Sequence, residues 1–170
     1  MPRVNTKIGD VFSVRVDENS KKYFQLIAFD LYQLNSEVIS AFKKVYPIDA
    51  NPSPPEIVKG EVEFYAHCET KLGTKMRLWE KVGNIADVGK ANHILFRDTS
   101  DYGYKRGEEP VKISEKWYVW RLGDLHPVRV GRLEGENRKA EIGLIFNPLT
   151  IVARIKTGKY LNHNVYPGFE

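Results

Sequence analysis

The sequence predicts a mostly β fold, a β-rich α+β domain built as a small SH3-like barrel or as a twisted antiparallel sheet elaborated by a C-terminal meander. Short segments rich in β-branched and aromatic residues recur along the chain, and turn-forming residues separate them. No long, clean amphipathic helix pattern interrupts them. The length of 170 residues and the hydrophobic content of 42% suit one domain over residues 1–170.

The chain opens on a predicted hairpin. Residues 11–16 are dense in β-branched and aromatic side chains, and every second residue from Phe12 to Val16 is apolar, as in a strand with one buried side. Residues 17–20 favour a turn. Residues 23–31 are apolar on both faces, which is typical of a central strand.

Two segments follow that are harder to interpret. Residues 37–46 combine apolar side chains at helical spacing with many β-branched residues, so that both helix and strand fit; we favour a strand. Three prolines stand between Pro52 and Pro55, and they exclude a helix interior or a paired central strand. We therefore predict a Pro-rich surface loop over residues 47–58.

The middle of the chain contains a regularly alternating segment. Residues 61–69 place Cys68 on an apolar face and His67 on a polar one, which predicts a half-buried strand. Residues 75–83 fit a strand or a short helix, and residues 93–97 a short strand.

The last part of the chain is predicted to be strands and loops. Residues 98–110 are polar and hold two glycines, which predicts a long, exposed, charged loop. Residues 116–122 form a strongly aromatic strand. The C-terminal meander is assigned to three further segments: 127–133, 140–146 and 150–155.

Composition indicates where the protein works. Cys68 is the only cysteine, so no internal disulfide can form and a reducing compartment fits. The apolar runs are too short to span a bilayer, and the N-terminus has no apolar segment typical of a signal peptide. We expect a cytoplasmic protein without a membrane partner.

The net charge of +4 is concentrated in the last third, where ten basic residues stand against six acidic ones. This pattern fits a mildly basic face for an acidic partner or nucleic acid, and equally an ordinary basic surface.

No catalytic, cofactor or metal motif stands out. Phosphate-binding glycine motifs and paired metal-ligand spacings are missing from the sequence. Cys68 and His67 are adjacent on a strand, so they point to opposite faces and cannot act as nucleophile and base. His67 with the carboxylates on its own face leaves a hydrolase as a third hypothesis.

Several aromatic and basic residues are candidates for contact with a partner. The glycine-flanked loop 103–107 combines tyrosine with basic residues, which suits a nucleic acid or a protein surface. The remaining candidates lie in the aromatic strand 116–122 and in a charged turn over residues 131–139. The predicted partner-binding residues are Tyr102, Tyr104, Lys105, Arg106, Trp120, Arg132 and Arg138.

The opening stretch carries a family resemblance. Residues 7–14, read as K-I-G-D-V-F-S-V, resemble the G-D-x-F-x-V start of the immunity protein 26 family. Residues 23–27 resemble its second strand, and residues 79–84 its later Trp-containing segment. The resemblance implies a β-rich fold and neutralisation of toxins from bacterial polymorphic toxin systems.

The first hypothesis is therefore a non-catalytic, cytoplasmic immunity protein that binds a cognate toxin. The alternative is a nucleic-acid-binding β domain that uses the Tyr/Lys/Arg loop.

Overall fold

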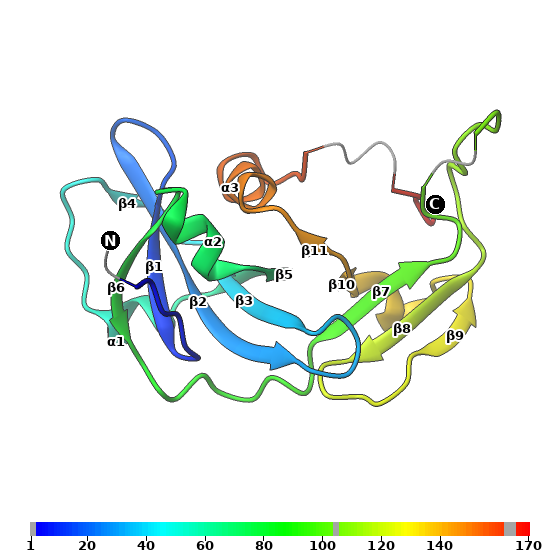
Figure 1. Cartoon of the computed structure of the whole chain (residues 1–170), viewed down its shortest axis with the longest axis horizontal. Helices are drawn as coiled ribbons and strands as arrows, with labels where there is room; N and C mark the ends of the chain where they lie inside the picture. Colours follow the sequence, from blue (N-terminus) through cyan, green and yellow to red (C-terminus); the bar gives the residue numbers. More distant parts are fainter. Residues whose placement is uncertain (1–2, 104–105, 162–165) are drawn as a thin grey trace.

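The chain forms two β-sheets that lie side by side (Figure 1). The computed structural model describes residues 3–103, 106–161 and 166–170. The β-rich α+β class is confirmed. In chain order the strands are β1 (Asp10–Arg15), β2 (Ser20–Asp30), β3 (Ser36–Phe42), β4 (Tyr46–Pro47), β5 (Val62–Cys68), β6 (Glu80–Asn84), β7 (Leu95–Thr99), β8 (Trp117–Arg121), β9 (Val128–Gly131), β10 (Glu141–Ile142) and β11 (Ile145–Phe146). The helices are α1 (Pro54–Val58), α2 (Thr70–Lys75), the short 3-10 helix η1 (Gly135–Lys139) and α3 (Pro148–Thr157).

The first sheet has the strand order β11-β5-β3-β2-β1-β6, with β4 paired to β2, and its strands β1, β2, β3 and β5 are antiparallel neighbours. The second sheet has the order β10-β7-β8-β9. Over the described residues neither sheet closes into a barrel, so of the two predicted architectures the open antiparallel sheet is the nearer. No described helix has the length and apolar character needed to cross a membrane.

Strands were predicted more accurately than the segments between them. The strand favoured for residues 37–46 is confirmed over residues 37–42, which lie in β3, whereas residues 43–45 form no strand. The last part of the loop predicted over residues 47–58 is a helix, α1. Pro54 and Pro55 fit the first turn of this helix, because the backbone N–H groups there have no partner within the helix. Ser53 caps that helix and Ile57 is buried beneath it.

The predicted C-terminal meander is wrong in two respects. Residues 150–155 lie in α3, where Asn147 caps the first turn and Pro148 begins the helix. The predicted meander places this Asn-Pro pair in the connection between the segments 140–146 and 150–155. In addition, β10 and β11 pair in parallel with β7 and β5, which belong to different sheets.

The β10–β11 segment joins the sheets through a close contact (Figure 1). Gly143 lies between these two strands, and its N–H donates to the carbonyl oxygen of Arg97 at 2.8 Å. A Cβ atom at Gly143 would lie 2.0 Å from Cη2 of Trp120. The indole of Trp120 therefore packs directly on the glycine backbone.

A buried polar network also ties the sheets together. Asp30, at the end of β2, accepts hydrogen bonds from Nε2 of His67 at 2.8 Å and from Nε1 of Trp120 at 3.2 Å. The backbone N–H of Gln33 donates to its other oxygen at 3.3 Å. Burial acts to raise the pKa of Asp30, but the bonds from His67 and Trp120 outweigh it and hold the pKa below its usual value.

We expect Gly143→Ala to destabilise the protein by about 1–3 kcal/mol, since the added methyl group overlaps the Trp120 ring. Urea unfolding measures the change. Gly168→Ala is the matched control, because a Cβ atom there meets nothing closer than 3.5 Å. Equal losses in the two variants would contradict the packing argument.

We expect Asp30→Asn to lower the free energy of unfolding by about 3 kcal/mol at pH 7, because it breaks the buried pair of Asp30 with His67. Because the pKa of Asp30 is lower in the folded protein, its ionised form stabilises the fold at pH values above the unfolded-state pKa of about 4. This stabilisation is lost as the pH falls below that value. In urea unfolding, the difference in the free energy of unfolding between Asp30→Asn and wild type should therefore shrink below about pH 4. Asp49→Asn, at an exposed carboxyl, is the control; a difference that stays constant with pH would refute the expectation.

Candidate partner-binding groove

The structure separates the predicted partner-binding residues. Tyr104 and Lys105 lie outside the described residues. Trp120 is only 3% exposed and donates to Asp30, so the prediction that it offers an aromatic face to a partner is wrong. Tyr102 and Arg106 are exposed, and the Tyr102 ring contacts that of Tyr166 with centroids 5.3 Å apart.

The two predicted arginines near the charged turn are already paired. Arg132 forms an ion pair with Glu115 at 2.5 Å. Arg138 pairs with Glu170 and lies over the ring of Phe169. Both side chains therefore already meet carboxylates of this chain.

The 98–110 segment is less uniform than the predicted exposed loop. Asp98 and Thr99 complete β7, and Asp98 accepts hydrogen bonds from the hydroxyl groups of Tyr118 and Tyr166. Burial raises the pKa of Asp98 in spite of these bonds. The described residues that follow are mostly exposed.

The prediction that His67 lies on the polar, solvated face of its strand is also wrong. The second sheet covers this part of β5, so the His67 side chain is fully buried and its ring lies 4.4 Å from that of Phe96. Glu63, a carboxylate of the same strand, pairs with Lys22 at 3.0 Å. Cys68 is buried as predicted, and burial raises the pKa of its thiol.

A groove of about 550 Å³ lies on the other side of the first sheet. The N-terminal segment forms one wall, α2 forms the other, and the turn end of the β2–β3 hairpin forms the floor. Its lining residues are Asn5, Thr6, Phe29, Asn35, Ser36, Glu37, Glu69, Lys71, Leu72 and Lys75.

Glu37, on β3, holds both walls to the floor. One oxygen accepts a hydrogen bond from the hydroxyl of Thr6 at 3.1 Å. The other accepts from the backbone N–H of Thr70 at 2.6 Å and from its hydroxyl at 2.7 Å. A single carboxylate thus fixes the width of the groove, since hydrogen bonds to a charged group are the stronger kind.

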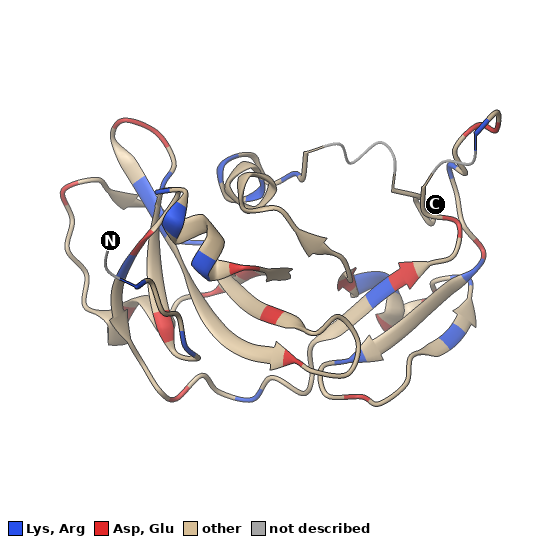
Figure 2. Ribbon diagram, in the orientation of Figure 1, with Lys and Arg blue, Asp and Glu red and all other residues tan. Residues whose placement is uncertain are grey.

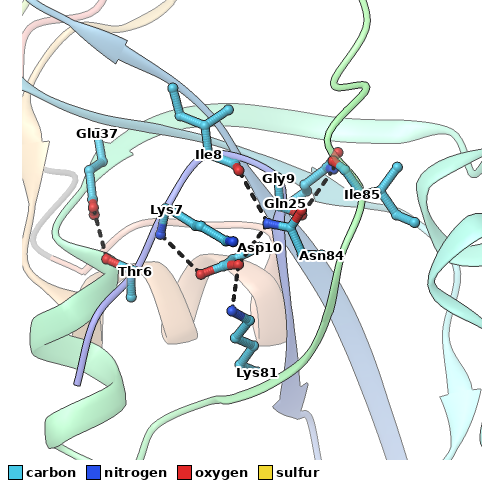
Figure 3. A network of polar contacts seen from close by, with 10 residues as sticks. All are labelled: Thr6, Lys7, Ile8, Gly9, Asp10, Gln25, Glu37, Lys81, Asn84 and Ile85. Carbon is cyan, nitrogen blue, oxygen red and sulfur yellow. Dashed lines mark hydrogen bonds and ion pairs between the residues drawn. The ribbon is translucent and has the colours of Figure 1, made fainter. Parts of the chain in front are cut away.

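The N-terminal wall is anchored by a second carboxylate, Asp10 (Figure 3). Asp10 is buried and pairs with Lys81 of β6 at 2.7 Å. It also accepts from the side-chain amide of Asn84 at 2.8 Å and from the backbone N–H of Lys7 at 3.0 Å. Burial acts to raise the pKa of Asp10, but these donors outweigh it and lower the pKa.

The backbone geometry explains why glycine stands before Asp10. Gly9 adopts φ +97°, and a Cβ atom there would lie 2.6 Å from the carbonyl oxygen of Ile85. Gln25 donates to that same oxygen at 3.1 Å (Figure 3). The G-D pair that carries the family resemblance is therefore used inside the fold, where it positions the wall of the groove.

The opposite wall, α2, is held by Trp79. The indole N–H of Trp79 donates to the carbonyl oxygen of Thr70 at 2.9 Å. Gly73 lets the helix approach this ring, because a Cβ atom there would lie 1.9 Å from Cζ2 of Trp79. Helix α2 therefore lies tightly against the sheet although it has only six residues.

The groove exposes apolar and basic groups together. Phe29 is 48% exposed and Leu72 is 39% exposed, and Leu31 continues the apolar surface into the β2–β3 turn at 60%. Lys71 and Lys75 lie one helical turn apart on α2 (Figure 2). Within the described parts of the chain, neither has a carboxylate within 4 Å.

Sequence reasoning did not find this groove. Phe29 falls in the segment 23–31, which is predicted as a strand apolar on both faces, and no element is predicted over residues 70–74. The i, i+4 spacing of Lys71 and Lys75 is a signal that could have indicated a helix face here. Comparison of the chain with protein-family models, with curated proteins and with solved structures gave no match.

We expect Glu37→Gln to lower the free energy of unfolding by about 1–3 kcal/mol, because an amide cannot replace all three charge-assisted hydrogen bonds. Thermal or urea unfolding measures it. Glu56→Gln should change stability by less than about 0.5 kcal/mol, since its pair with Lys44 is exposed. A Glu37 variant as stable as the Glu56 variant would show that the carboxylate does not hold the walls.

Proposed function

We propose that the protein is a non-catalytic binding protein, an immunity protein that neutralises a cognate bacterial toxin by direct contact. The observation that supports this most is the groove beside α2. It presents Phe29 and Leu72 between walls that are fixed by partly buried polar contacts. Apolar anchors on a rigid frame are what a tight protein interface needs, because little conformational entropy is lost on binding.

The occupant we propose is a segment of the toxin with apolar side chains and neighbouring acidic ones. The apolar side chains would pack on Phe29 and Leu72. The acidic ones would meet Lys71 and Lys75, whose charges are not used within the described chain. Opposite charges at the rim speed association and select the partner.

The resemblance of residues 7–14 supports a toxin as the partner class. Gly9 and Asp10, within this stretch, position the N-terminal wall of the groove. The resemblance therefore bears on the scaffold of the groove, while the residues that would contact the toxin lie on β2 and α2.

The other two hypotheses receive less support. Arg132 and Arg138 are paired with carboxylates, so binding of phosphate would have to break those pairs first. His67 has no exposed surface from which to reach a substrate, which weakens a hydrolase centred on it.

Co-expression with the toxin encoded by the adjacent reading frame tests the proposal. We expect the wild-type chain to abolish killing and to elute with the toxin in size-exclusion chromatography. Continued killing, with no complex on the column, would refute it.

The groove itself is tested with two variants in the same assay. Lys71→Glu/Lys75→Glu and Leu72→Asp should each weaken toxin binding by about tenfold or more, a change of about 1.4 kcal/mol. Lys90→Glu and Val45→Asp are the matched controls, since both residues are exposed and lie outside the groove. Complex formation that all four variants leave unchanged would place the toxin on another surface.

A further inference from the structure

A second cavity, of about 370 Å³, lies on the first sheet, where β1, β2 and the connection from α2 to β6 meet. It shares no lining residue with the groove beside α2. Its volume falls within the range of small-molecule sites, which begins at about 300 Å³. Six residues that line it are Ser13, Arg15, Lys21, Ile48, Arg77 and Glu80.

Two cations of this cavity stand directly opposite each other on neighbouring strands. Arg15 of β1 pairs with Lys21 of β2, so their side chains leave the same face of the sheet with Cβ atoms about 5 Å apart. Like charges placed in this way repel each other and destabilise a sheet. Among the described residues, no carboxylate lies within 4 Å of either side chain, and the Lys21 ammonium lies over the Tyr23 ring, 5.9 Å from its centroid. The repulsion is therefore not relieved by an ion pair within this part of the fold.

Arg77 adds a third cation from a backbone conformation that arginine disfavours. It follows the last turn of α2 with φ +58°, in the left-handed region. Its N–H donates to the carbonyl oxygen of Thr74 at 3.0 Å, and the N–H of Leu78 donates to that of Gly73 at 3.0 Å. This is the pattern with which helices commonly end on a glycine. Because arginine is strained there relative to glycine, we expect a role of its side chain to offset the strain.

Two acidic groups lie near these cations and leave an excess of positive charge. Glu80 lines the cavity and stands opposite Ser13 on β6. Asp17, in the turn of the first hairpin, interacts electrostatically with Arg15, and it accepts a hydrogen bond from the backbone N–H of Asn19 at 2.8 Å. Neither carboxylate forms an ion pair within 4 Å with a residue that the structure describes. In the lining itself, three positive charges face one negative charge.

We propose that this cavity binds a phosphate dianion, carried by a small phosphate monoester or free in solution. A doubly charged group among the three cations would remove the repulsion between Arg15 and Lys21. The guanidinium of Arg77 can donate two parallel hydrogen bonds to phosphate oxygens. The half-buried side chains of Ile48 and Leu78 provide surface for the apolar part of an ester. The proposal does not depend on toxin binding, because the two sites share no lining residue.

The probe is phenyl phosphate, and its binding to the full-length protein is followed by 15N–1H NMR at about pH 7.5, where the ester is mostly doubly charged because its second pKa is about 6. We expect saturable shifts at Arg15, Lys21 and Arg77, with a Kd in the millimolar range or tighter. Benzenesulfonate has the same ring and one charge, so it should bind about tenfold more weakly. Inorganic phosphate separates the two sources: affinity equal to that of phenyl phosphate identifies the free ion as the ligand, and weaker binding identifies the ester.

Arg77→Gly separates the proposed role of this side chain from a structural one. Glycine suits the left-handed backbone, so the variant should be at least as stable as wild type in thermal unfolding, yet bind phenyl phosphate about tenfold more weakly. Lys21→Gln should weaken binding by a similar factor. Glu80→Gln should strengthen it about twofold to threefold, because a repelling carboxylate is removed. Lys90→Gln is the control, at an exposed residue outside the cavity, and should change affinity less than about twofold.

Three results would overturn the proposal. The first is the lack of saturable shifts with phenyl phosphate in the wild-type protein. The second is an Arg77→Gly variant that loses stability and keeps its affinity. The third is binding of an oligothymidylate of about eight nucleotides more than about tenfold tighter than phenyl phosphate, which would assign the cavity to a nucleic acid.

Discussion

The carboxylate of Asp30 is the group on which the arrangement of the two sheets depends. A carboxylate without exposed surface must be surrounded by donors, and Asp30 finds them on three separate parts of the chain: His67 of β5, Trp120 of β8 and the turn at Gln33. Two of the donors belong to different sheets. Satisfying the charge therefore fixes how the second sheet packs on the first, and Gly143 lets the same indole fit closely.

The groove beside α2 is organised by the same physical principle. Glu37 and Asp10 each gather donors from segments far apart in the sequence, such as Thr6 and Thr70 for the first and Lys81 for the second. Polar contacts of this kind have directions, whereas apolar contacts do not, so they set positions that hydrophobic packing alone leaves loose. The apolar side chains on the floor and on α2 can then stay exposed without loss of order in the walls.

The proposed toxin site uses this scaffold directly. The groove lies beside α2 on the first sheet and offers exposed apolar side chains with basic neighbours, which suits a protein segment.

Local pattern was enough to predict β1, β2, β3 and β5 of the first sheet, since alternation and turn residues such as those of β1 and β2 act over a few neighbours. It also placed Cys68 in the core. Tertiary structure alone decided the burial of His67 and Trp120, because the surface that covers them comes from the other sheet. Likewise, Asn147-Pro148 fits both a turn and a helix start; the buried positions Ile151 and Ile155 make it a helix. The groove joins residues distant in sequence, from Asn5 to Lys75, so local pattern could not show that they meet.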